Sequence, residues 1–339
     1  VEPTAATATA DADAAAEPKD VPPPLSPNGA PATAVVVSPD GKLLATTGVA
    51  NDRPAILVRE LATGKLLHTL SGHQDTIASL AFSADNRRLV SGSADKTVRV
   101  WDLADAKFPE AATFAGHDAA VTGASFNSNA TQVISGAANN SVKLWDVATG
   151  EELQDFAGHT AAIVGVAMTP NNQLVISAAA DKTVRFWNPA DGKQARLITD
   201  TAALTAMSVS RDGTQIAAAR ADGSVNIFNQ ADGKLLATLT GHAAAVRSLA
   251  FSPDGKRLIS AAPASPGKVA DRAFVWNTDS GRLLEILPTA AKLSAVTYGP
   301  AADSVLLATT DAGLSLHTLR FAVALGDMTE PVTALAYSP

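Results

Sequence analysis

The residue types of a hydrolase triad recur in this sequence at fixed spacing. Ser91, His73 and Asp95 are, by type, the nucleophile, the general base and the acid that orients the base in acyl transfer. An equivalent set recurs at the same offsets further along the chain, and Ser91 falls in the middle of an expected strand, without a nucleophile elbow. Because a hydrolase needs one such set, the repetition favours a structural role. We expect no catalytic residue and no enzyme activity.

Histidines that follow a glycine are the candidate metal ligands. These are His73, His117, His159 and His242. They fall in different repeats, too far apart to share one ion at ligand distances of about 2 Å. The Asp-Gly and Asn-Asn turns lack the dense acidic loop of calcium motifs, and no glycine-rich phosphate loop occurs. The sequence therefore predicts neither a metal nor a cofactor.

Charge and cysteine content narrow the classes of partner. The 339 residues include 26 Lys+Arg and 33 Asp+Glu, a net charge of −7. This balance argues against binding to a nucleic acid backbone, which needs clustered Lys and Arg. No apolar stretch approaches the roughly 20 residues of a membrane span, so no membrane insertion is expected. Cysteine is absent, which excludes disulfides and favours a periplasmic or extracellular location over a cytoplasmic one.

A short turn phrase repeats along the chain. Copies begin at Ser38, Ser83, Asn127, Thr169, Ser210 and Ser252, 41 to 45 residues apart. A period of about 40–45 residues with several short strands per unit is typical of propeller blades. In one unit, strands are expected over residues 77–83, 88–94, 98–103 and 111–115, because β-branched residues alternate between Asn-, Asp- and Gly-bearing turns.

Counting four-strand units gives seven. Their inner strands begin near Ala34, Ile77, Val121, Ile163, Leu204, Val246 and Leu293, about 44 residues per unit. The predicted fold is an all-β, seven-bladed propeller of four-stranded antiparallel blades over residues 32–330. Residues 1–31, rich in Ala, Thr and Pro, are expected to form a linker or tether.

The last residues do not fit a ring of seven. Residues 331–339 look like the inner strand of a further repeat whose other strands are missing. They could start a second propeller, complete an eight-bladed ring, or replace a strand at the ring closure. We expect the chain to be part of a longer polypeptide.

Paired Gly-His and Trp-Asp or Trp-Asn dipeptides carry a family resemblance. They are Gly72-His73 with Trp101-Asp102, Gly116-His117 with Trp145-Asp146, Gly158-His159 with Trp187-Asn188 and, more loosely, Gly241-His242 with Trp276-Asn277. The chain resembles the WD-repeat β-propeller family, and we expect a bacterial-type member. The resemblance implies structural hydrogen-bonded tetrads: His73, Ser91, Asp95 and Trp101; His117, Ser135, Asn139 and Trp145; His159, Ser177, Asp181 and Trp187; and His242, Ser260 and Trp276, where Asp271 could supply the acid.

The chemistry of a tetrad stands without the family. A buried indole N–H only donates, so it needs an acceptor; serine can accept it and donate to histidine, which donates to the carboxylate. The fifth unit loses the His, the Ser and the Trp donor together, and the seventh unit is degenerate as well. The fifth unit has Asp200, Ala218, Asp222 and Phe228 at the four positions, the seventh has Thr289, Leu307, Asp311 and His317, and the first has Arg59 in the Trp place.

The sequence favours a non-catalytic scaffold that presents propeller faces to partner proteins of unknown identity. Expected contacts on the Gly-His side are Gln74, Asp75, Lys96, Asp118, Asn140, Thr160, Lys182, Arg247, Lys268 and Arg272, with two longer loops at residues 49–54 and 263–272. Arg220, Arg247 and Arg272 could also contact acidic groups. Two alternatives remain: an accessory propeller of a longer exported enzyme or cytochrome-containing protein, and an architectural subunit of a larger assembly.

Overall fold

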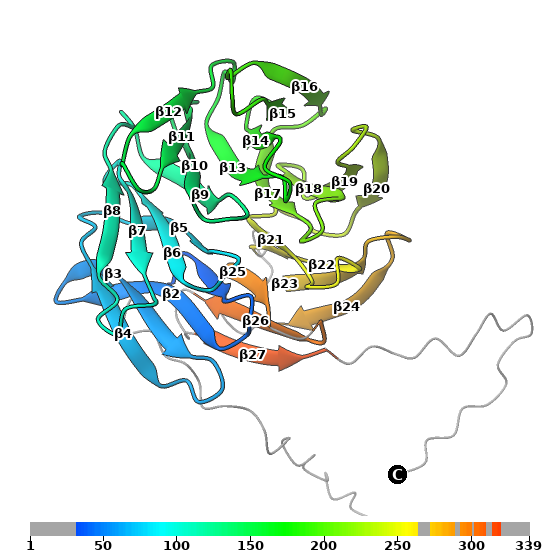
Figure 1. Cartoon of the computed structure of the whole chain (residues 1–339). Helices are drawn as coiled ribbons and strands as arrows, with labels where there is room; N and C mark the ends of the chain where they lie inside the picture. Colours follow the sequence, from blue (N-terminus) through cyan, green and yellow to red (C-terminus); the bar gives the residue numbers. More distant parts are fainter. Residues whose placement is uncertain (1–31, 264–271, 289–291, 300–301, 310–313, 320–339) are drawn as a thin grey trace, which may run out of the picture.

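The structure, a computed structural model, consists of β-sheets arranged around a ring (Figure 1). It describes residues 32–263, 272–288, 292–299, 302–309 and 314–319. Seven antiparallel sheets follow one another along the chain, and no helix occurs among these residues. The prediction of an all-β, seven-bladed propeller is confirmed.

Each blade is a meander whose first strand faces the centre of the ring and whose last strand lies at the rim (Figure 1). Blades 1 to 3 comprise β1 (Val35–Val37), β2 (Leu43–Ala50), β3 (Arg53–Glu60) and β4 (Leu66–Ser71); β5 (Ile77–Phe82), β6 (Arg88–Ser93), β7 (Val98–Asp102) and β8 (Glu110–Phe114); and β9 (Val121–Phe126), β10 (Gln132–Ala137), β11 (Val142–Asp146) and β12 (Glu152–Asp155). Blades 4 and 5 comprise β13 (Ile163–Met168), β14 (Val175–Ala179), β15 (Thr183–Trp187) and β16 (Gln194–Thr199); and β17 (Leu204–Val209), β18 (Gln215–Arg220), β19 (Val225–Asn229) and β20 (Leu235–Leu239). Blades 6 and 7 comprise β21 (Ser248–Phe251), β22 (Arg257–Ala262), β23 (Arg272–Asn277) and β24 (Leu283–Pro288); and β25 (Leu293–Tyr298), β26 (Ser304–Thr309) and β27 (Leu314–Thr318).

The hydrophobic core lies between neighbouring blades. One cluster joins Ile176 and Phe186 of blade 4 to Leu204, Ile216 and Phe228 of blade 5. The middle strands of a blade are covered on both faces by the neighbouring blades, so they are largely buried; β14, for example, is buried at every position. A blade alone would leave both of these faces in water, which is why the units need their neighbours.

The ring closes by packing of blade 7 against blade 1. Val35 and Leu44 share a core cluster with Leu306, Ala308 and Leu314. Three strands of blade 7 are described, and the chain beyond Leu319 lies outside the described residues. The predicted tether at 1–31 and the predicted extra inner strand at 331–339 also lie outside them.

Two sequence-based expectations need correction. Residues 49–54 are not a loop: β2 and β3 extend through them to a two-residue turn at Asn51 and Asp52, with φ of 50° and 60°. Asn and Asp tolerate this left-handed conformation, and such a turn matches the twist of a hairpin. The sixth inner strand begins at Ser248 and not near Val246. The other predicted loop lies largely outside the described residues.

Candidate functional site

The two ends of the strands form two faces of the ring. Because the strands alternate in direction, the connections between blades and the turns between second and third strands meet at one end, which we call the Gly-His face. The turns between first and second strands, which carry the repeated Ser-Pro-Asp-Gly phrase, lie at the other end, which we call the turn face.

Blade 2 places the four residues of its expected tetrad in one chain of hydrogen bonds. Trp101 Nε1 donates to Ser91 Oγ at 3.0 Å, and Ser91 Oγ lies 2.8 Å from His73 Nε2. His73 Nδ1 lies 2.8 Å from Asp95 Oδ2. Because the indole only donates, the serine hydroxyl is free to donate to Nε2, and Nδ1 carries the proton that Asp95 accepts. The chain is therefore complete with a neutral histidine.

Electrostatics keep this network in that protonation state. Burial lowers the pKa of His73 and outweighs the opposing effect of Asp95. Burial raises the pKa of Asp95, but hydrogen bonds from the Thr97 hydroxyl, the Gln74 backbone N–H and His73 outweigh it and lower the pKa to about 2. A neutral histidine beside an ionised carboxylate suits a fixed structural contact.

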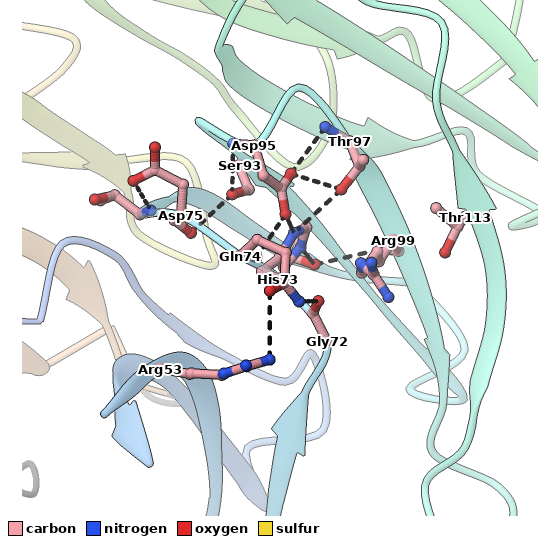
Figure 2. A network of polar contacts seen from close by, with 12 residues as sticks. Arg53, Gly72, His73, Gln74, Asp75, Ser93, Asp95, Thr97, Arg99 and Thr113 are labelled. Atoms are coloured by element: carbon pink, nitrogen blue, oxygen red, sulfur yellow. Dashed lines mark hydrogen bonds and ion pairs between the residues drawn. The ribbon is translucent and has the colours of Figure 1, made fainter. Parts of the chain in front are cut away.

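The same groups would be poor catalysts. Ser91 is fully buried, His73 is 1% exposed, and the Ser91 hydroxyl is shared between an indole and an imidazole (Figure 2 shows the surrounding contacts of His73). A nucleophile must reach its substrate with a free hydroxyl, and this one is enclosed by its own blade. The geometry supports pinning of the Gly-His loop to the sheet.

Blade 4 repeats the arrangement closely. His159 Nδ1 lies 2.7 Å from Asp181 Oδ2, and its Nε2 lies 2.8 Å from Ser177 Oγ. Trp187 Nε1 donates to the same hydroxyl at 2.8 Å. Asp181 also accepts the backbone N–H of Thr160 at 3.0 Å, which ties the loop after the histidine to the turn of the blade.

Blade 3 differs at the acidic position. Trp145 Nε1 and His117 Nε2 meet Ser135 Oγ at 2.8 and 2.7 Å. His117 Nδ1, however, contacts Ser141 Oγ at 2.9 Å, and the Ser141 hydroxyl donates to Asn139 Oδ1 at 3.0 Å. Asn139 thus reaches His117 only through Ser141. Without a carboxylate partner, burial and then the charge of Lys143 lower the pKa of His117 to about 4.

Blade 6 retains three members. Trp276 Nε1 and His242 Nε2 lie 2.8 and 2.7 Å from Ser260 Oγ, and the His242 ring stacks on Phe274 with centroids 4.1 Å apart. Burial lowers the pKa of His242 to about 4. Asp271, which could supply the acid, lies outside the described residues.

Blade 5 holds a different network where the sequence shows only a degenerate repeat. Asp200 Oδ1 lies 3.0 Å from Arg220 Nε, and Asn226 Nδ2 donates to Asp200 Oδ2 at 2.8 Å. Arg220 also lies 3.4 Å from Asp222 and donates to the Thr201 hydroxyl at 2.5 Å. Arg220 is therefore engaged by groups of its own blade, and its contact with an external acidic group stays a prediction.

A hydroxyl two residues after the acidic position completes several of these networks, and the sequence reading missed it. Thr97 Oγ1 and Thr183 Oγ1 each donate to the carboxylate at 2.6 Å, and Ser141 bridges to His117 in blade 3. Ser224 occupies the same place in blade 5 and donates to Asp222 at 2.6 Å. The signal was present as a Thr or Ser at one constant offset.

Most of the expected partner contacts are exposed on the Gly-His face, and Asn140 is half-buried. Exposed are Gln74, Asp75, Lys96, Asp118, Thr160, Lys182, Arg247 and Arg272, whereas Lys268 lies outside the described residues. Lys96, Asn140 and Lys182 occupy the same turn position, with φ of 71–72°. In Figure 2, Gln74 lies between the Arg53 guanidinium, at 3.4 Å, and the carbonyl of Gly72. These side chains stand directly above the buried tetrads.

Two kinds of feature are absent from the described ranges. No group of three or more His, Asp or Glu side chains there is placed to hold a metal ion. None of the described elements is a helix long and apolar enough to cross a membrane.

A family model described as "WD domain, G-beta repeat" matches five segments of the chain. The segments are residues 64–102, 109–146, 150–188, 193–229 and 233–268, together more than half of the chain. Each of the first four contains the outer strand of one blade followed by the three inner strands of the next. The sequence repeat is thus offset from the structural blade and links neighbouring sheets covalently.

Curated relatives share short segments with the chain. A periodic tryptophan protein 2 homolog from Schizosaccharomyces pombe is 39% identical over 69 residues, which cover 20% of this chain and 8% of the relative. Protein ROOT INITIATION DEFECTIVE 3 of Arabidopsis thaliana is 41% identical over 73 residues, covering 22% and 16%. WD repeat and SOCS box-containing protein 1 of Xenopus tropicalis is 46% identical over 65 residues, covering 19% and 15%.

The similarity therefore concerns a small part of each relative's length. All three organisms are eukaryotes, so these relatives do not support the expected bacterial type.

Proposed function

Because the chain belongs to the WD40 repeat family, we propose that it is a non-catalytic scaffold that binds other proteins through the faces of its propeller. The observation that carries this proposal is the state of its chemically reactive side chains. The Ser, His and Asp side chains of blades 2 and 4 are bonded to one another beneath the surface. What the Gly-His face offers to the solvent is a set of polar and charged side chains on short turns.

The buried networks favour binding because they hold those turns in place. Asp95 accepts the backbone N–H of Gln74 at 2.9 Å, and Asp181 that of Thr160 at 3.0 Å. Each exposed side chain therefore extends from a loop whose backbone is anchored to the blade. A surface that is ordered before binding loses less conformational entropy when a partner docks.

Charge on the Gly-His face suggests the chemistry of the partner surface. Exposed Lys96, Lys182 and Arg247 are interspersed on this face with exposed Asp75 and Asp118. A partner with both signs of charge fits this pattern. We expect association to weaken as salt rises, since exposed pairs are screened within about 10 Å at 0.1 M salt.

An accessory role in a longer polypeptide is the second candidate. The aligned segments cover 8–16% of the three relatives, and the name of one joins WD repeats to a SOCS box. A propeller of this family can thus occur beside other domains. In this role the ring would position an enzyme or cytochrome domain, of bacterial or other origin; an architectural subunit of a larger assembly is a related possibility.

Crosslinking in the native source, followed by purification and mass spectrometry, tests the scaffold proposal. A variant with Gln74, Lys96, Asp118 and Lys182 changed to Ala is compared with a control carrying Arg87→Ala and Lys256→Ala, whose side chains are exposed on the turn face. We expect a reproducible partner that the first variant loses and the control retains.

A monomer with no reproducible partner, or a partner retained by both variants, would contradict the use of the Gly-His face. A full-length sequence with a Cys-x-x-Cys-His motif or an enzyme domain would favour the accessory role. A native mass equal to many copies of the chain would favour the architectural one.

A further inference from the structure

A cavity of about 530 Å³ opens on the turn face, opposite the expected partner contacts. All seven blades contribute to its wall, at the centre of the ring of inner strands (Figure 1). Its size falls in the range of about 300–1,000 Å³ that ligand pockets occupy.

The wall of the cavity carries a ring of apolar side chains at one repeated position. Each inner strand contributes its last residue: Val37, Phe82, Phe126, Met168, Val209, Phe251 and Tyr298. Four of the seven, Val37, Phe82, Val209 and Phe251, are only half-buried. Apolar surface left in contact with water inside a hollow favours a ligand that removes it from water.

Among the described residues, a single charged side chain, Arg211, lines this cavity. It holds the second position of the repeated turn phrase, where three other blades have Pro39, Pro170 and Pro253. Arg211 is exposed and makes no hydrogen bond or ion pair with any described residue. No ion pair joins Arg211 to the neighbouring Asp212, whose Oδ1 accepts the Ser210 hydroxyl at 2.6 Å and the Thr214 backbone N–H at 3.0 Å.

The arrangement selects the kind of ligand. A guanidinium free at the rim of an apolar ring matches a carboxylate adjacent to an apolar side chain. The inner strands surround the cavity, so a ligand enters along the axis of the ring. A chain end can do this without a second segment of the same chain having to leave, and the last residue of a polypeptide carries its carboxylate and its side chain on one carbon.

We propose that this cavity binds the carboxyl-terminal residue of a partner polypeptide, with an apolar last side chain inside the ring and the terminal carboxylate on Arg211. The inference rests on the proposed scaffold function, and it adds a second binding surface and the chemistry of one partner. It requires no contribution from the Gly-His face.

Fluorescence anisotropy with labelled hexapeptides tests the proposal directly. The probes are Gly-Ser-Gly-Ser-Gly-X peptides with X as Leu, Met, Phe or Tyr, each as free acid and as carboxyl-terminal amide, and one free acid that ends in Gly. We expect at least one free acid to bind with Kd below about 1 mM, about tenfold tighter than its amide, and no binding of the Gly peptide.

Two variants locate the binding. Arg211→Pro introduces the residue that three other blades hold and sacrifices no backbone hydrogen bond described for Arg211; it should remove the preference for acid over amide. Val209→Phe introduces the side chain that three other blades hold and fills part of the cavity; it should weaken acid and amide alike. Arg87→Ala, exposed on the same face but outside the cavity wall, should change neither.

Absence of binding by all free acids, equal binding of acid and amide, or an acid preference that survives Arg211→Pro would each overturn the inference. These failures are distinct from failure of the scaffold proposal. A partner that depends on the Gly-His face, together with peptides that do not bind, would contradict the cavity alone. Peptide binding without any crosslinked partner would contradict the Gly-His face alone.

Discussion

Blades 4 and 5 are neighbours in the ring, yet they connect the same loop to the sheet with different polar groups. In blade 4, His159 joins Asp181 on one side and Ser177 on the other. In blade 5, Asp200 stands where the histidine stands in blade 4, and it meets Arg220 and Asn226. One loop is held by a neutral imidazole and the other by an ion pair.

The buried aromatic residue also differs between blades 4 and 5. Trp187 of blade 4 donates to Ser177, whereas blade 5 has Phe228 and Ala218 at the two corresponding positions, and both of these are buried. The donor and its acceptor are absent together, so neither is left unsatisfied. Blade 5 therefore dispenses with this hydrogen bond without leaving a buried donor or acceptor at either of the two positions.

The largest expected effect comes from breaking the network of blade 5. Arg220→Met leaves the Asp200 carboxylate, whose side chain is 4% exposed, without its cation. We expect a loss of about 3 kcal/mol in the free energy of unfolding, because an unpaired buried charge is strongly destabilising. Urea denaturation measures it, and a loss below about 0.5 kcal/mol would show that the ion pair does not hold the loop.

Trp145→Phe breaks the corresponding contact of a tetrad blade. The substitution removes the indole donor from Ser135 and alters the packing against Phe114, and we expect a cost of about 1–3 kcal/mol. A double-mutant cycle with Ser135→Ala separates the hydrogen bond from packing, with an expected coupling of about 0.5–1.5 kcal/mol. A neutral Trp145→Phe, or zero coupling, would mean that the tetrad of blade 3 is assigned wrongly.

Lowering the pH should destabilise the histidine contacts of blades 3 and 6 more than those of blades 2 and 4. Burial lowers the pKa of His117 and of His242 from 6.5 to about 4, so the unfolded chain binds protons that the folded chain refuses. Their stabilising contribution is fully present above about pH 6.5 and is lost as the pH falls toward 4. We expect about 1 kcal/mol from each histidine between pH 7 and pH 5, after allowance for solvent screening.

Denaturation curves at pH 7, 6 and 5 measure this loss in the parent chain and in His242→Gln. The variant should lose less stability over the interval than the parent chain does. An identical loss in both proteins would argue that His242 is already protonated or exposed in the folded state.

The smallest expected effect makes blade 3 resemble its neighbours. Asn139→Asp supplies the carboxylate that Asp95 and Asp181 supply in blades 2 and 4. We expect a gain of about 0.5–1 kcal/mol at pH 7, since a hydrogen bond to a charged acceptor is stronger than one to an amide. The gain should disappear as acid protonates the new carboxylate. If denaturation shows no gain at pH 7, the Ser141 hydroxyl is already a sufficient hydrogen-bond partner for His117.

The spacing of the sequence repeat predicted much of this structure. The phrase that recurs every 41–45 residues predicted the blades and their strands. The resemblance to the WD-repeat family implied the contacts among His73, Ser91 and Trp101, which the structure shows at 2.8 and 3.0 Å. Irregular units were predicted less well. The sequence predicts a loop over residues 49–54, where the structure has the hairpin of β2 and β3, because the alternation of apolar and polar residues is weak near Asn51 and Asp52.

The amino-acid sequence determined the local and repeated features of the molecule. Strand alternation, turn residues and the pairing of donors with acceptors depend on residues at constant offsets, so they can be predicted from the residues of each unit alone. Only the tertiary structure decided how different units meet. Val35 and Leu44 of blade 1 share a core cluster with Leu306, Ala308 and Leu314 of blade 7, and seven separate strand ends enclose one cavity with Arg211 at its wall. Closure of the ring brings those distant positions together, and a linear pattern does not encode distances between units.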